Sequence, residues 1–111
     1  MATKTPTFKV YLAGKVTGED FNAVKAKFAK KQKELEALGY KVINPVTAID
    51  NLNLNWTRAM KRCIDMVPKC DAIYLMADWK KSTGAKIEYL VADKFGLLKL
   101  FEETNERANC K

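Results

Sequence analysis

The chain is predicted to be an α/β domain in which helices cover both faces of an open parallel sheet. Short apolar segments alternate with segments of helical periodicity, and glycine or proline residues separate them. No apolar run is long enough to cross a bilayer. The expected strands are 8–14, 40–44, 72–77 and 97–101, and the expected helices are 19–39, 55–67 and 84–95. We assign all of 1–111 to one domain, with 1–7 and 102–111 as candidate flexible tails.

Capping and stop residues set the boundaries of the first half. Glu19 or Asp20 begins the first helix, and Gly39 ends it as a C-cap. Pro45 stops the second strand. The apolar residues of this helix share one stripe: Phe21, Val24, Phe28, Leu35 and Leu38.

The second half follows the same pattern. Residues 46–54 are expected to form a loop or a short turn, because their Asn and Asp side chains compete with regular structure. Asn55 or Thr57 caps the second helix, which Pro68 ends, and Gly96 terminates the third. The second helix is expected to turn these residues inward: Trp56, Met60, Cys63, Ile64 and Val67.

The composition restricts the chemistry available to the chain. It contains no histidine, which excludes Ser–His or Cys–His catalysis and imidazole-bound metals. The three cysteines, Cys63, Cys70 and Cys110, are widely spaced, which favours neither a disulfide framework nor a zinc site and fits a reducing cytoplasm. The N-terminus lacks the apolar segment of a secretory signal. We therefore expect no metal and no cofactor.

The formal net charge of +7 favours anionic partners such as nucleotides, phosphorylated metabolites or nucleic acid. Much of the excess lies on the first helix, at Lys25, Lys27, Lys30, Lys31 and Lys33. No aromatic residues alternate with these lysines to stack bases. A solvated helix face is therefore favoured over a nucleic-acid groove.

Two loops are expected to meet at the carboxyl edge of the sheet. With strand order 2-1-3-4, the order reverses between the first and third strands, where ligands of such sheets bind. The first loop offers Gly14, Lys15 and Gly18 to an anion, although its glycines also fit a plain tight turn and lack P-loop spacing. The second offers Ser82, Gly84 and a helix N-terminus.

Two aromatic residues near this edge have two interpretations each. Trp79 could stack on a base, or it could simply cover the end of the sheet. Tyr11 could point its phenol toward the same space, or it could anchor the core.

Glu88 is the candidate catalytic carboxylate. It shares a helical stripe with Gly84, Val91 and Phe95, which places it on or beside the inward face near the helix N-terminus. The helix end would favour the ionised carboxylate, whereas burial would disfavour it. The alternative is a surface Glu88 that only complements the helix dipole.

Four segments together resemble a known superfamily: 11–18 (YLAGKVTG), 44–45 (NP), 70–75 (CDAIYL) and 79–88 (WKKSTGAKIE). They are similar to short, uncharacterised proteins of bacteriophages and prophages in the nucleoside 2-deoxyribosyltransferase-like superfamily. The resemblance spans residues 8–101. It implies a flavodoxin-like (Rossmann-like) sheet of four or five strands, in the order 2-1-3-4(-5). It also implies cleavage or transfer at an N-glycosidic bond, in a homodimer or higher homo-oligomer whose subunits share active sites.

The resemblance implies a role for several residues. Glu88 would attack the anomeric carbon and form a covalent glycosyl-enzyme, and Tyr11 would orient it. Ser82 matches the serine of the nucleotide-hydrolysing branch, which favours nucleoside monophosphates over free nucleosides.

One position departs from the relatives. They carry a second acid that protonates the departing base, and Cys63 occupies that position here. Asp65 is two residues further on, about 200° around the helix. Either Asp78 supplies the proton, or the activity is altered or lost.

The leading hypothesis is therefore cleavage or transfer at the N-glycosidic bond of a nucleoside monophosphate or nucleoside. One alternative is a nucleotide-binding or sequestering protein without turnover. The other is a basic nucleic-acid-binding accessory protein. A membrane partner is not expected.

Overall fold

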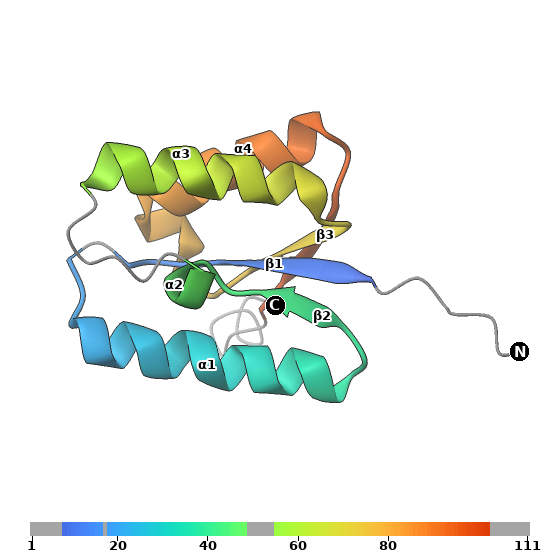
Figure 1. The fold of residues 1–111 in the computed structure, drawn as a ribbon, viewed down its shortest axis with the longest axis horizontal. Coiled ribbons are helices and arrows are strands. Elements are labelled where there is room, and N and C mark those ends of the chain that lie inside the picture. Colours follow the sequence, from blue (N-terminus) through green and yellow to red (C-terminus); the bar gives the residue numbers. More distant parts are fainter. Residues whose placement is uncertain (1–7, 17, 49–54, 103–111) are drawn as a thin grey trace, which may run out of the picture.

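A computed structural model describes residues 8–16, 18–48 and 55–102. The described residues form a four-stranded, all-parallel sheet in the order β2-β1-β3-β4. Helices α1 and α2 lie on one face and α3 and α4 on the other (Figure 1). The predicted α/β class, strand order and two-sided cover of helices are confirmed. Within the described residues, no helix is long and apolar enough to span a membrane.

The predicted strands and helices are all present, with ends shifted by a few residues. The strands are β1 (Lys9–Ala13), β2 (Lys41–Ile43), β3 (Ala72–Leu75) and β4 (Leu98–Phe101). The helices are α1 (Phe21–Ala37), α2 (Pro45–Ala48), α3 (Trp56–Met66) and α4 (Thr83–Lys94), with 3-10 turns at Val67–Lys69 and Trp79–Lys81.

Side-chain caps decide where the long helices begin. Asp20 accepts the backbone N–H of Ala23 at 3.0 Å, and Asn55 accepts that of Arg58 at 2.9 Å. Ser82 does the same for Ala85 of α4 at 3.1 Å. Each cap satisfies a backbone donor that the first helical turn leaves unpaired.

The segment after β2 differs from the prediction. We expected a loop or short turn over 46–54, but α2 occupies its beginning; residues 49–54 and the tail beyond 102 lie outside the described residues. Asn44 explains the helix, because its side-chain oxygen accepts the N–H of Val46 at 2.9 Å. Pro45 then fits the first helical position, where no N–H is needed.

Strand β1 carries the centre of the core. Its successive side chains point to opposite faces, so Tyr11 packs with the cluster under α3 and α4, and Leu12 packs with the cluster under α1. Both are fully buried. The chain therefore leaves the end of β1 between the helices that cover the two faces of the sheet.

The stripe predicted for α4 is partly wrong. Its buried residues are Ala85, Glu88 and Ala92. Val91 is half-buried, and Phe95 is 66% exposed beyond the end of the helix. Glu88 is thus centred on the inward face of α4, rather than beside it.

Candidate active site

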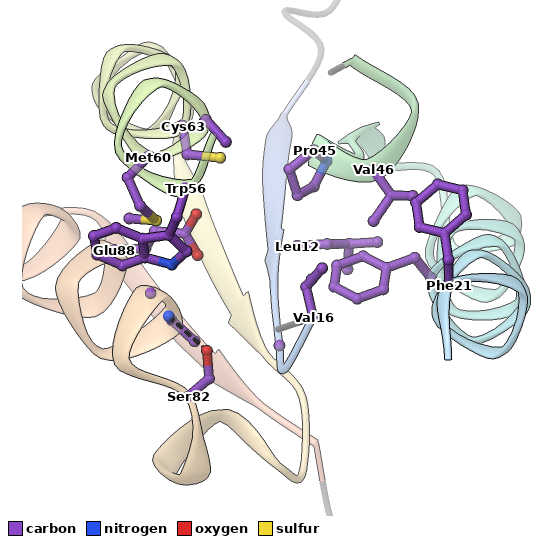
Figure 2. Close-up of a pocket in the computed structure, with 15 residues that line it drawn as sticks. Leu12, Val16, Phe21, Pro45, Val46, Trp56, Met60, Cys63, Ser82 and Glu88 are labelled. Atoms are coloured by element: carbon purple, nitrogen blue, oxygen red, sulfur yellow. Dashed lines mark hydrogen bonds between the residues drawn. The ribbon is translucent and has the colours of Figure 1, made fainter. Parts of the chain in front are cut away.

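A cavity lies at the carboxyl end of β1, between the two helical layers (Figure 2). Trp56, Met60 and Cys63 of α3 line one side together with Glu88 of α4. The opposite side is formed by Phe21 of α1 with Pro45 and Val46 of α2, and Leu12 and Val16 lie between the two sides. The cavity therefore occupies the place where the strand order reverses, as predicted.

Glu88 is buried in the wall of this cavity. Its exposed fraction is 5%, which contradicts the alternative of a surface carboxylate that only complements the helix dipole. Tyr11 donates its hydroxyl to Glu88 Oε2 at 2.6 Å. Burial raises the pKa of Glu88 to about 7, against the opposing effects of the Tyr11 hydrogen bond and the Cys63 thiol.

The helix end does not keep Glu88 ionised. Glu88 is the sixth residue of α4, so it lies beyond the first turn, where the effect of the helix dipole is concentrated. Burial therefore has the largest effect on the pKa of Glu88. Near neutral pH, both the protonated and the ionised form of the carboxyl are populated.

Tyr11 serves both interpretations proposed for it. Its ring is fully buried in the core, and its hydroxyl reaches the cavity carboxylate. Burial, followed by the negative charge of Glu88, raises the pKa of Tyr11 well above its ordinary value. The phenol therefore keeps its proton and remains a hydrogen-bond donor.

Cys63 stands in the same wall as Glu88. The side chain is buried, and burial together with the charge of Glu88 raises the pKa of its thiol to about 12. Asp65, the neighbouring carboxylate on α3, is exposed and does not line the cavity. The position expected to hold an acid thus holds a protonated thiol.

Asp78 has a different place from the one predicted for a proton donor. It does not line the cavity that contains Glu88. Its two oxygens accept the backbone N–H of Lys15 at 3.0 Å and the Lys27 ammonium at 2.7 Å. Partial burial raises the pKa of Asp78, but the bond from Lys27 and the Lys15 amide outweigh it, so the pKa is lowered.

Asp78 and Lys27 form a clamp on the loop that follows β1. Besides its bond to Asp78, the Lys27 ammonium donates to the backbone oxygen of Lys15 at 3.0 Å. One residue of the loop is therefore held through both its N–H and its carbonyl. This backbone N–H is consequently engaged and is not offered to an anion as we expected.

The glycines of the two loops differ in their surroundings. Gly14 lines the cavity, and a Cβ there would lie 2.7 Å from Met76 Sδ and 3.2 Å from Met76 Cβ. Gly84 also lines the cavity, where a Cβ would meet Met60 Sδ at 3.0 Å. Gly18 lines no described cavity, and its φ of 85° supports the plain-turn interpretation.

A second, more polar recess adjoins the first cavity. Lys15, Lys81 and Thr83 line it, and it shares Trp56, Ser82 and Gly84 with the cavity of Glu88. Two lysine side chains and the start of the twelve-residue helix α4 therefore line a recess that adjoins the cavity of the buried carboxylate. Lys15 also pairs with Glu19 at 3.4 Å.

Trp79 packs away from the cavity. Its ring lies 4.9 Å from that of Tyr89 and 6.2 Å from that of Phe101. The interpretation in which this residue covers the end of the sheet fits these contacts, and stacking on a base does not.

Several residues of the site were not predicted from the sequence. Pro45, Val46 and Phe21 were given no role in binding, and Lys81 was not considered. Trp56 and Met60 were assigned only to the core, yet their spacing with Cys63 puts all three on one helix face. The 46% exposure of Trp56 shows that this face extends from the core into the cavity.

The described residues define an α/β domain with an open, all-parallel sheet of the flavodoxin-like kind. Among solved structures, the chain is similar to a "2-desoxiribosyltransferase from Leishmania mexicana", with a TM-score of 0.65 and 20% sequence identity. The match covers 85% of this chain and 63% of that one, and at this identity it shows the fold. The chain belongs to the family described as "Domain of unknown function (DUF4406)", whose model matches residues 8–101. No curated protein matches the sequence.

Proposed function

We propose that this protein cleaves or transfers across the N-glycosidic bond of a nucleoside monophosphate or nucleoside, with Glu88 as the nucleophile. The observation that carries the proposal is the buried Glu88 carboxyl in the cavity wall, held at 2.6 Å by the hydroxyl of Tyr11. Burying a carboxyl is costly unless it is used or paired, and a raised pKa in a cavity is typical of functional sites.

The reaction would proceed in two displacements. A Glu88 oxygen attacks the anomeric carbon as the C–N bond breaks, and the bond's electron pair leaves with the base. The adjacent carboxylate stabilises the oxocarbenium character of the sugar and then traps it as an ester. Water, or a second base in a transfer reaction, breaks this ester and regenerates the carboxylate. Tyr11 holds the attacking group in place.

The adjoining recess favours a phosphorylated substrate. Lys15 and Lys81 supply positive charge there, and Ser82 supplies a hydroxyl at the start of α4. A 5′-phosphate in this recess would place its sugar next to Glu88, because the two cavities share Trp56, Ser82 and Gly84. The homodimer or higher assembly and the cytoplasmic location belong to the same proposal.

The test is release of free base from deoxynucleoside monophosphates, followed by chromatography. Wild type should release base, and so should the control Glu36→Ala, which changes an exposed carboxylate. Glu88→Ala should release none. A folded wild type that releases no base from any substrate, or equal release by Glu88→Ala, would contradict the enzyme.

A protein that binds nucleotides without turnover is the second candidate. The protonated thiol at Cys63 favours it, because Glu88 has no second carboxylic acid beside it among the described residues that line the cavity. This candidate predicts thermal stabilisation that grows with nucleotide concentration, without formation of product.

The nucleic-acid alternative is less well supported. Lys27 pairs with Asp78, and Lys31 pairs with Glu34 and Glu102, so part of the positive charge of α1 is already neutralised. If this alternative held, DNA affinity would fall steeply as salt increases.

A further inference from the structure

The cavity around Glu88 combines one carboxyl with apolar and aromatic walls. Among the described residues that line it, Glu88 and Cys63 are the ionisable ones. The rings of Phe21, Phe28 and Trp56 and the thioether of Met60 line the same space. Such walls offer few partners to the hydrogen-bonding edge of a neutral base. They do offer favourable surfaces to a cation, which is attracted to aromatic faces and to a carboxylate.

Departure of an uncharged base poses a problem in this cavity. When the C–N bond breaks, the electron pair goes to the base, which leaves as an anion unless a proton arrives. Burial raises the pKa of the Cys63 thiol to about 12, which makes it a weak acid and a poor proton donor to the base. Asp78 is bound to Lys27 and Lys15 outside the cavity, and Asp65 is exposed on α3. No described acid other than Glu88 itself is placed to protonate the base.

Building on the proposed function, we propose that the substrates are nucleotides whose base already carries a positive charge. A pyridinium nucleotide or an N7-alkylated purine nucleotide has this chemistry. Breaking the C–N bond of such a base sends the electron pair to the ring, which cancels the charge and releases a neutral molecule. One C–O bond forms to Glu88, and no proton is required. Water then replaces Glu88 at the sugar and gives up one proton to solvent.

The charge of such a substrate also acts on Glu88. An opposite charge within about 4–6 Å favours the ionised carboxyl, so the bound base would lower the raised pKa of Glu88. Binding would thereby generate the nucleophile. In the transition state the positive charge moves from the base to the sugar, and it remains beside Glu88 throughout.

The experiment compares a matched pair, 7-methyl-2′-deoxyguanosine 5′-monophosphate and 2′-deoxyguanosine 5′-monophosphate. Base release is measured by chromatography, and the rate with Glu88→Gln, which includes the rate without protein, is subtracted. Nicotinamide mononucleotide provides a second cationic probe. Wild type should release the methylated base at least about 100-fold faster than the neutral one, the lower end of what an absent general acid costs.

The C–N bond of a cationic base also breaks faster than that of a neutral base without any enzyme. Variants at Cys63 distinguish this intrinsic difference from the proposed effect of the cavity. Cys63→Asp places a second carboxylic acid beside Glu88 in the cavity wall and should accelerate release of the neutral base by about 10²–10⁴-fold. Release of the cationic base should change by less than about tenfold, because its departure needs no proton. Cys63→Ser, the matched control, supplies no carboxylic acid and should not accelerate release of the neutral base. The exposed variant Glu36→Ala should leave both rates near wild type.

Binding supplies a readout that is independent of turnover. The cation 1-methylnicotinamide should raise the melting temperature of wild type more at pH 8 than at pH 5, since ionised Glu88 attracts it. Uncharged nicotinamide should not show this pH dependence, and Glu88→Gln should abolish it.

Wild-type release of the neutral base within about tenfold of the cationic base would overturn this inference and leave the proposed function standing. Equal acceleration of both substrates by Cys63→Asp would also overturn it. Release of neither base by a folded wild type would instead refute the proposed function on which the inference depends.

Discussion

At the scale of single residues, the proposed chemistry depends on the groups that surround Glu88. The sequence indicated a carboxylate on or beside the inward face of a helix, and the structure centres it there. The neighbour that matters, Tyr11, comes from 77 positions earlier in the chain. The resemblance singled out both residues. Spacing along one helix could not predict the hydrogen bond between them, because the sheet register places β1 under α4.

The raised pKa of Glu88 predicts a dependence of stability on pH. Between pH 4.5, the ordinary pKa of this group, and about 7, the folded protein holds a proton that the unfolded chain has released. Stability should therefore fall as pH rises through this window, by about 3 kcal/mol in total. Urea denaturation from pH 4 to pH 8 should show the loss in wild type. Glu88→Gln should lack this component.

The exposed carboxylate variant Glu36→Gln is the control for this measurement and should follow wild type. A Glu88→Gln variant whose free energy of unfolding changes in parallel with wild type across the window would contradict the assignment.

Tyr11→Phe should affect both stability and activity. It removes the hydroxyl that donates to Glu88 at 2.6 Å, which should cost about 1–3 kcal/mol. The pKa of Glu88 should rise further, because the Tyr11 hydrogen bond lowers it. The acidic limb of the kcat/KM profile should therefore shift to higher pH. Tyr40→Phe, on a half-buried ring that packs against Phe8, should leave that limb in place.

At the scale of elements, the loop after β1 is shaped by contacts with the loop after β3. The glycines of this loop fitted a phosphate-binding turn and a plain tight turn equally well. Neither glycine indicated that Asp78 would hold Lys15 or that Lys27 of α1 would complete the clamp. A carboxylate after a strand is equally consistent with catalysis and with a structural role, and only the partners distinguish the two.

Asp78→Asn tests the clamp. It keeps the shape of the side chain but weakens the bonds from the Lys27 ammonium and the Lys15 amide, at a cost of about 1 kcal/mol for this partly exposed group. Hydrogen exchange should become faster at the backbone N–H of Lys15. Asp93→Asn, which removes an exposed ion pair with Lys99, should leave this exchange unchanged. Unchanged exchange in Asp78→Asn itself would show that the clamp does not hold the loop.

Gly14→Ala tests how closely the two loops approach. Its Cβ would meet Met76 Sδ at 2.7 Å and Met76 Cβ at 3.2 Å, so the variant should lose about 1–3 kcal/mol of stability. The double variant Gly14→Ala with Met76→Ala should show less than the sum of the two single losses, because the shorter side chain removes the clash. Additive losses in chemical denaturation would place the cost of Gly14→Ala elsewhere.

At the scale of the whole molecule, the order β2-β1-β3-β4 determines where the site lies. Alternating periodicity and stop residues predicted a parallel α/β sheet, and the resemblance implied the strand order. The composition of the cavity was harder to predict, because its walls come from α1, α2, α3 and α4 at once. Residues such as Trp56 and Met60 have ordinary core spacing, and only the packed structure shows that part of their surface faces a cavity.

Trapping the covalent intermediate tests directly whether Glu88 is the nucleophile. Wild type is mixed with a nucleotide substrate, quenched in acid within milliseconds to seconds, digested and analysed by mass spectrometry. We expect an ester between Glu88 and the anomeric carbon of the sugar phosphate, and we expect it to be absent from Glu88→Gln. An ester on another residue, or one that forms equally in Glu88→Gln, would contradict this expectation.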